Sequence, residues 1–317
     1  MVEETTTYLR MDGETPADPD NPTGSRGQII ELRAGDAGTL DGVTRWSYDG
    51  AELPVDERDL QAAQVTTRDI DRGDFPHFLL KEITASPGSF RKTLRGKLVD
   101  EDGRISVLLS SDNLPASVRA GLRSGRIARV QVIGQGTAAI AGQSLAHALA
   151  EFLADTEVRV EAVLATELSG FGMRADMSDT LVVAISQSGT TTDTNRTVDL
   201  VRSRGAEVIA IVNRRGSDLT DKADGVLYTS DGRDVEMSVA STKAFYSQVA
   251  AGLLLSQAIA DEVPGGKASG DPDQQQLLRD LRDLPDRMEE ALGVRADAAE
   301  AARAFGPSRR YLSLIHI

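Results

Sequence analysis

Short apolar segments alternate with helical segments over the second half of the chain, and this alternation constrains the fold more than any other feature. The segment 180–185 is nearly all apolar, which is typical of a strand covered on both faces of a sheet. Five strands are predicted, at residues 129–133, 158–164, 180–185, 207–212 and 225–228. Helices are predicted at residues 138–154, 191–204 and 240–261. The pattern therefore predicts an α/β fold in which helices flank a doubly wound, five-stranded parallel sheet.

Residues 1–60 carry a different pattern. Asp-Gly pairs, which favour turns, occur at residues 12–13, 41–42 and 49–50. The alternating runs at 28–33 and 43–48 predict hairpin strands. Because the region is too short and too rich in loops to form a sizeable core alone, we expect it to be the β-rich end of a larger domain.

The segment 61–125 is predicted to be a linker followed by lead helices. Apolar residues recur on one helical face over residues 75–83. We expect Pro87 to break or restart this helix. The residues expected to continue it, at a spacing of four, are Phe90, Leu94 and Leu98.

The C-terminal part predicts the beginning of a further unit. After a linker at 263–272, residues 273–305 read as two helices and residues 309–315 as the first strand of another α/β domain. Because such a domain cannot end on a buried first strand, we expect this chain to be truncated. The predicted domain organisation is 1–60, 61–125, 126–262 and 263–317.

The composition argues against several classes of function. Lys and Arg number 35 and Asp and Glu 49, and the net charge of −14 disfavours nucleic acid or an anionic membrane as a partner. The chain has no cysteine and three histidines, so we expect no metal site, no cofactor and no cysteine nucleophile. We expect no membrane contact and a cytoplasmic location, because the sequence has neither a long apolar run nor a signal peptide.

A cluster of hydroxyl residues follows the apolar strand at 180–185. Residues 186–192 read Ser-Gln-Ser-Gly-Thr-Thr-Thr and lead into a predicted helix. Ligands of open α/β sheets bind at the carboxyl ends of the strands, and the free N–H groups at a helix N-terminus favour a phosphate. A single Ser or Thr here would more simply be a helix cap, but five hydroxyls and a glycine together favour anion binding.

Two further helix starts are predicted at the same edge of the sheet. Residues 134–137 (Gly-Gln-Gly-Thr) follow the first strand, although a lone Gly-x-Gly often marks only a tight turn. Residues 239–245 (Val-Ala-Ser-Thr-Lys-Ala-Phe) open the last helix, and alone they would be read as two caps and a surface charge. Glu167 and Glu236 are candidate acid or base groups, but each is more often a surface or structural carboxylate.

Together these segments resemble the isomerase half of the glucosamine-6-phosphate synthases, the isomerising glutamine:fructose-6-phosphate aminotransferases. The matching pieces agree in order and spacing, and they are residues 81–83, 93–97, 136–137, 186–189 and 239–245. The resemblance implies that residues 126–262 form a phosphosugar-binding SIS (sugar isomerase) domain and that residues 1–60 end a glutaminase-like domain. It also implies a ligand, fructose 6-phosphate or glucosamine 6-phosphate, in contact with Gly136, Thr137, Ser186, Gln187, Ser188, Gly189, Thr191, Val239 and Ser241.

The chain departs from the family pattern in ways that bear on its activity. Ala138 stands where the family usually has a ligand-contacting serine, and Thr190 where it often has Glu. The resemblance implies that the glutaminase cysteine and the catalytic groups of a second SIS repeat are missing from this sequence. We therefore expect no catalytic residue in this chain and no turnover by it alone.

The resemblance implies that the intact enzyme is a homodimer or larger. It is expected to make glucosamine 6-phosphate from fructose 6-phosphate and glutamine, with ammonia passed between its two halves. One alternative is a two-repeat SIS ketose/aldose isomerase, deaminase or deglycase. The other is a non-catalytic phosphosugar-sensing module.

Overall fold

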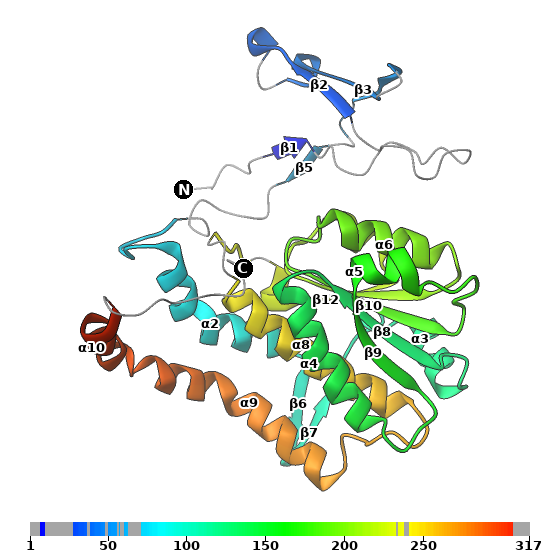
Figure 1. Ribbon diagram of the computed structural model, residues 1–317, viewed down its shortest axis with the longest axis vertical. Coiled ribbons are helices and arrows are strands. Elements are labelled where there is room, and N and C mark those ends of the chain that lie inside the picture. Colours follow the sequence, from blue (N-terminus) through cyan, green and yellow to red (C-terminus); the bar gives the residue numbers. More distant parts are fainter. Residues whose placement is uncertain are drawn as a thin grey trace. The chain divides into compact units, whose positions relative to one another are not determined.

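The computed structural model describes nine stretches of the chain: residues 7–9, 28–36, 39–47, 50–55, 57, 60–62, 71–232, 234–237 and 241–306 (Figure 1). The chain divides into two units, Met1–Thr66 and Thr67–Ile317, which we describe separately.

The described part of the first unit consists of small antiparallel sheets. Strand β2 (Gln28–Leu32) pairs with β3 (Val43–Ser47), which also pairs with β4 (Glu52–Leu53). This confirms the strands predicted at 28–33 and 43–48. The remaining elements are β1 (Thr7–Leu9), which pairs with β5 (Leu60–Ala62), and the 3₁₀ turns η1 (Ala34–Asp36) and η2 (Leu40–Gly42).

Apolar side chains of the first unit are poorly covered. Among its described residues the buried ones are Gly42 and Arg45, whereas Ile29, Ile30 and Leu32 of β2 are 52%, 40% and 73% exposed. Because these aliphatic side chains stay exposed, the strand buries little apolar surface. The expectation that the region does not build a core alone stays a prediction.

The second unit is built on a five-stranded parallel sheet. Its strands are β8 (Arg129–Gly134), β9 (Arg159–Leu164), β10 (Thr180–Ser186), β11 (Glu207–Val212) and β12 (Gly225–Tyr228). They lie in the order β12-β11-β10-β8-β9. Every strand coincides with a predicted one to within about one residue, so the predicted sheet is confirmed. The strand order reverses between β8 and β10, because the chain continues outward from each of them in opposite directions.

Helices cover both faces of this sheet (Figure 1). Successive residues of β10 point to opposite faces, and both sets are buried. Leu181, Val183 and Ile185 belong to the core with α4 and α8. Val182 and Ala184 belong to the opposite core with α6. The α-helices are α3 (Ala116–Arg123), α4 (Thr137–Phe152), α5 (Ala165–Glu167), α6 (Thr192–Arg202), α7 (Asp218–Lys222) and α8 (Lys243–Glu262). Two further helical turns are η4 (Leu168–Gly172) and η5 (Thr229–Gly232).

The expectation that Pro87 breaks the lead helix is wrong. Helix α2 (Phe78–Leu94) continues through Pro87, which is buried within it. Pro87 has no N–H to donate to the carbonyl of Ile83, and the hydroxyl of Ser86 donates to the neighbouring carbonyl of Glu82 at 2.9 Å. Packing of α2 against α8 outweighs the helix-breaking preference of proline at this position.

The helix also ends earlier than expected. Leu98 was expected to continue it but begins strand β6 (Leu98–Glu101), because Gly96 adopts a left-handed φ of 69° and terminates α2. Strand β6 pairs with β7 (Arg104–Val107) in a hairpin that the sequence analysis did not anticipate. Asp102 and Gly103 form its turn with φ of 53° and 83°, the combination that a two-residue hairpin turn requires.

Two helices follow the SIS-like region, as expected for residues 273–305. They are α9 (Pro272–Leu292) and α10 (Arg295–Phe305), while the strand predicted at 309–315 lies outside the described residues. Leu281 of α9 packs against Phe90 of α2 and Leu254 of α8. None of the helices in the described ranges is both long and apolar enough to cross a bilayer.

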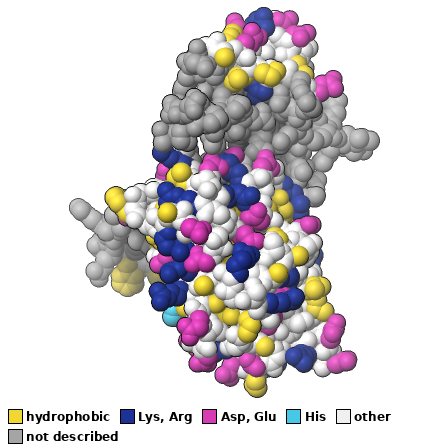
Figure 2. Space-filling model, turned by 90° about the vertical axis from the view of Figure 1, so that its right-hand side faces the viewer, with side chains coloured by type: hydrophobic (Ala, Val, Ile, Leu, Met, Phe, Trp, Pro, Cys, Tyr) yellow, Lys and Arg dark blue, Asp and Glu magenta, His cyan; other side chains and the backbone are white. Residues whose placement is uncertain are grey.

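Charged side chains of both signs are interspersed over the face drawn in Figure 2. Some of the charged side chains form ion pairs between elements, for example Arg91 of α2 with Asp286 of α9 at 2.7 Å. Arg282 of α9 likewise lies 3.0 Å from Asp100 of β6. Exposed pairs contribute little stability each, so the apolar packing of Leu281 is the more important contact of α9.

Candidate functional site

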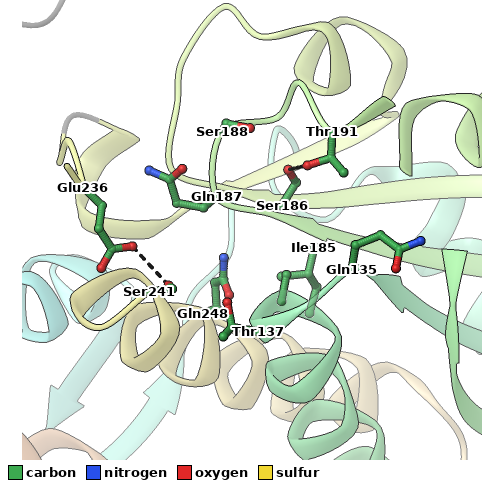
Figure 3. Close-up of a pocket in the computed structure, with 11 residues that line it drawn as sticks. Gln135, Thr137, Ile185, Ser186, Gln187, Ser188, Thr191, Glu236, Ser241 and Gln248 are labelled. Atoms are coloured by element: carbon green, nitrogen blue, oxygen red, sulfur yellow. Dashed lines mark hydrogen bonds between the residues drawn. The ribbon is translucent and has the colours of Figure 1, made fainter. Parts of the chain in front are cut away.

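A pocket of about 220 Å³ opens at the carboxyl ends of β8 and β10, where the strand order reverses (Figure 3). A crevice at this point of an open α/β sheet is the usual place for a ligand, because the loops after the two strands diverge there. The pocket is lined by Gln135, Thr137, Ala138, Ile185, Ser186, Gln187, Ser188, Thr191, Glu236, Ser241 and Gln248.

Residues 186–191, which we call the phosphate loop, form one wall of the pocket. Ser186 Oγ accepts a hydrogen bond from the N–H of Gly189 at 3.0 Å and lies 3.2 Å from Thr191 Oγ1. Ser188 Oγ accepts from both the N–H and the hydroxyl of Thr190, at 3.2 and 3.0 Å. The loop is thus held in a compact turn, and the hydroxyl hydrogen of Ser188 is left to point at a ligand.

Helix α6 begins at the phosphate loop with uncapped donors. Its N-cap residue, Thr191, makes no side-chain hydrogen bond to the first turn. Within the described residues, the first backbone N–H of this turn to find an acceptor is that of Asn195, bonded to Thr191 O at 3.0 Å. The N–H groups of Thr192, Asp193 and Thr194 therefore remain available to an anion, with the positive end of the helix dipole behind them.

Gly189 shapes the loop without lining the pocket. Its φ is 68°, and an added Cβ would lie 2.0 Å from Ser217 Oγ. Only glycine fits this backbone conformation and this space. Its carbonyl also accepts from the N–H of Leu219 at 3.0 Å, which ties the loop to α7.

The helix start after β8 contributes Thr137 to the pocket. Gly136, with φ of 56°, precedes α4 as its N-cap residue and is exposed, but it does not line the pocket. Of the expected contacts, the structure brings together Thr137, Ser186, Gln187, Ser188, Thr191 and Ser241. Val239 lies outside the described residues.

Of the two candidate acid or base groups, one lines the pocket and the other does not. Glu167 lies on α5, is exposed and does not line the pocket. Glu236 lines the pocket, and its Oε1 accepts from the N–H groups of Thr242 and Ala244 at 2.6 and 3.4 Å. Its Oε2 accepts from Ser241 Oγ at 3.1 Å. Glu236 thus caps α8 from six residues upstream and faces the ligand space at the same time.

Sequence reasoning missed several pocket residues. Gln135 precedes the expected Gly-Thr pair, so it was within reach of the motif, whereas Ala138, which follows the pair, had been noted as a departure from the family pattern. Gln248 carried a weaker signal, because it is one of several polar residues in a largely apolar helix. It is 2% exposed, and its Oε1 accepts no hydrogen bond from any described residue. A buried amide oxygen without a partner is costly, so a ligand donor at this position would be favourable.

The segment before α8 is held in place by α2. The backbone N–H of Met237 donates to Glu82, and Asp234 forms an ion pair with Lys92 at 3.3 Å. Burial disfavours the charged form of Asp234, yet hydrogen bonds from Ser230 and Ser89 hold the pKa of its carboxyl below the ordinary value. The pocket wall that carries Glu236 therefore depends on a partly buried, charged anchor.

No group of three or more His, Asp or Glu side chains in the described stretches is arranged to hold a metal ion. The chemistry of the site is instead that of hydroxyls, amides, helix N-termini and one carboxylate. Such a set binds and orients a polar anion.

Residues 126–258 match the family of SIS domains. The chain contains a SIS domain. Outside the SIS domain the similarity continues, because the chain is 36% identical over 274 residues to the isomerising glutamine–fructose-6-phosphate aminotransferase of Corynebacterium glutamicum, covering 84% of this chain. It is 33% identical over 298 residues to the enzyme of that name from Thermus thermophilus, covering 90% of this chain. The resemblance inferred from the motifs is thereby confirmed.

The SIS domain fold also matches a solved structure. The C-terminal domain of glucosamine-fructose-6-phosphate aminotransferase from Francisella tularensis superposes with a TM-score of 0.61 at 24% identity, covering 74% of this chain and 61% of that one. At this identity the match concerns the fold alone. The chain spans 39% and 44% of the lengths of the C. glutamicum and T. thermophilus relatives.

Proposed function

We propose that the pocket of the SIS domain binds a hexose 6-phosphate, with the phosphate on the phosphate loop. The observation that carries this proposal is the start of α6, where Thr192, Asp193 and Thr194 present N–H groups without partners among the described residues. Ser186, Ser188 and Thr191 surround the same point with hydroxyls. A phosphate can accept from both sets, and each charge-assisted bond is about twice as strong as a neutral one.

The remaining expected contacts belong to the same proposal. Gly136 and Gly189 do not line the pocket and would serve binding through the turns that they shape, whereas Val239 would face the sugar next to Ser241. Holding the phosphate fixes the position of the sugar carbons, which is how binding distant from the reacting atoms contributes to catalysis. In this proposal the chain supplies binding and orientation, and the groups that move protons between C1 and C2 lie outside it.

We propose further that the chain works as the sugar-phosphate-binding part of a glucosamine-6-phosphate synthase. The support is the identity of 33–36% to two aminotransferases of that activity over 84–90% of the chain. Residues 1–60 would then be the end of the glutaminase-like domain, 61–125 the connecting part, 126–262 the first SIS domain and 263–317 the approach to the second. The complete protein would be a cytoplasmic homodimer or larger assembly that uses fructose 6-phosphate and glutamine.

Calorimetry on the purified chain tests the proposal. We expect fructose 6-phosphate to bind at least about tenfold more tightly than fructose, because the sugar alone forgoes the charge-assisted bonds. Inorganic phosphate should compete with it more weakly, since it reaches the loop without contacting the α8 side of the pocket. Equal binding of fructose and fructose 6-phosphate, or no binding of either, would contradict the proposal.

A further inference from the structure

Asn195 is a buried polar side chain that contacts the phosphate loop from the protein interior. It lies in the first turn of α6, is 5% exposed and does not line the pocket. Its Nδ2 donates to the carbonyl of Gly189 at 3.0 Å and to the carbonyl of Thr191 at 3.2 Å. An asparagine amide has two N–H hydrogens, and both are thereby used on the backbone of one loop.

The direction of this amide follows from its neighbours. Both partners are carbonyl oxygens, which only accept hydrogen bonds, so the nitrogen and not the oxygen of the side chain has to face them. Asn195 Oδ1 is buried and accepts no hydrogen bond from any described residue. Because an unpartnered buried oxygen lowers stability, the side chain contributes through its two donors.

Asn195 supplies the second hydrogen bond to each of the two carbonyl oxygens. Gly189 O also accepts from the N–H of Leu219, and Thr191 O from the backbone N–H of Asn195, each at 3.0 Å. A carbonyl oxygen has two lone pairs, so both oxygens are fully used. Without the side chain, one lone pair of each oxygen would be free, and a carbonyl that tilted towards the pocket would repel a phosphate.

The same bonds orient two N–H groups of the loop. In a trans peptide unit the C=O and the N–H point in opposite directions, so a carbonyl held inward turns the following N–H outward. The carbonyl of Thr191 shares its peptide unit with the N–H of Thr192, one of the three backbone donors proposed for the phosphate. The carbonyl of Gly189 shares its unit with the N–H of Thr190, which donates to Ser188 Oγ at 3.2 Å. Two of the proposed ligand contacts therefore depend on these bonds.

We infer that Asn195 is a positioning residue of the phosphate site, which holds the carbonyls of Gly189 and Thr191 away from the anion. The inference rests on the proposed function and adds to it a residue that touches no ligand. Inorganic phosphate is the probe that isolates this role, because it can occupy the loop without contacting the sugar side of the pocket. Fructose 6-phosphate is the second probe, and a loss confined to the phosphate contact changes both affinities by the same factor.

Calorimetry of the full 317-residue chain, well below the melting temperature of each variant, measures the Kd of both probes. Asn195→Leu nearly keeps the side-chain volume and removes both donors, so both Kd values should rise about fivefold or more. Asn113→Leu is the matched control, because it makes the same chemical change in an amide that donates to Val226 O at 2.8 Å, at the amino end of β12. It should lower the melting temperature but leave both Kd values within about twofold of those of the unmodified chain.

A smaller substitution keeps the test decisive if Asn195→Leu fails to fold. Asn195→Ser retains one donor, which on a helix can reach the carbonyl four residues earlier, that of Thr191, but leaves Gly189 without its second bond. Both Kd values should then rise about two- to fourfold, less than with leucine.

Three results would overturn the inference or its basis. Unchanged Kd values in the Asn195 variants that fold, with lower melting temperatures, would show a purely structural role and overturn this inference alone. A rise for fructose 6-phosphate without a rise for inorganic phosphate would also overturn it, because the loss would then lie in the sugar contacts. If neither probe binds the unmodified chain, the proposed function is wrong and the inference falls with it.

Discussion

Replacing Ser188 by Ala isolates the phosphate contact proposed for the loop after β10. Ser188 Oγ accepts from the N–H and the hydroxyl of Thr190, at 3.2 and 3.0 Å. Both interactions use lone pairs of Ser188, so its hydroxyl hydrogen is free for a phosphate oxygen. With Ala at this position, the ligand loses one hydrogen-bond donor and Thr190 loses the oxygen that accepts its two hydrogen bonds.

The two losses should differ in size. A hydrogen bond to a charged phosphate contributes about 1.5–3 kcal/mol, which corresponds to a rise in Kd of roughly 10- to 150-fold. Thr190 is exposed, so water can replace the acceptor that its N–H and hydroxyl lose. We therefore expect the free energy of unfolding to fall by less than about 1 kcal/mol.

Calorimetric titration with fructose 6-phosphate and urea unfolding, both on the full chain, measure the two quantities. Thr190→Ala is the matched control, because it removes one partner of Ser188 next to the pocket without lining it. Its Kd should change by less than about twofold. If Ser188→Ala left the Kd unchanged while the free energy of unfolding fell, the hydroxyl would stabilise the turn and the assignment of the phosphate site would be wrong.

Three other substitutions test separate steps of the argument. Gly189→Ala should lower the free energy of unfolding by about 2–4 kcal/mol in urea titrations, since its φ of 68° and the 2.0 Å approach to Ser217 both oppose a side chain; an unchanged value would contradict this. Asp234→Asn should reduce stability by about 1 kcal/mol or more at pH 7, because the lowered pKa of Asp234 stabilises the fold above about pH 4. That difference from the unmodified chain should shrink as the pH falls below about 4 through the folded-state pKa, and a pH-independent difference would argue against the charged anchor. Ala138→Ser places a hydroxyl in the pocket lining, at a position where the aminotransferase family usually has one. Calorimetry should show that fructose 6-phosphate binds about threefold or more tightly to this variant. No gain in affinity would show that the position does not contact the ligand.

The sheet was predictable because its central strands, β8, β10 and β11, are buried on both faces. Residues 180–185 are apolar except for Thr180, and β10 proves to be buried at every position. Apolar runs of this kind leave no ambiguity about which segments enter the core. The phosphate loop followed from the same reasoning, since a polar cluster directly after such a strand has to lie at the carboxyl edge of the sheet.

The parts that could not be predicted depend on contacts between distant segments. Nothing within residues 78–94 alone shows that packing on α8 would carry the helix through Pro87. Gln248 enters the pocket only because α8 packs on the same core as β10. The hairpin of β6 and β7 was missed for another reason. The pair Asp102-Gly103 is a turn signal in the sequence, but the two strands that it joins are too short to be recognised from their pattern.

Helix α2 belongs to the site although it precedes the matched SIS range of 126–258. The turn before Glu236 holds Ser230 and Asp231 at φ of 46° and 60°, a conformation that costs non-glycine residues about 1–2 kcal/mol each. Thr93 of α2 offsets part of this cost, because its Oγ1 accepts from the buried N–H of Ser230 at 2.9 Å. Glu82, about three turns earlier on the same face of α2, accepts from the N–H of Met237. The strained turn places Glu236 against the pocket only while α2 supplies these partners, so the position of the carboxylate is a property of α2 and the SIS domain together.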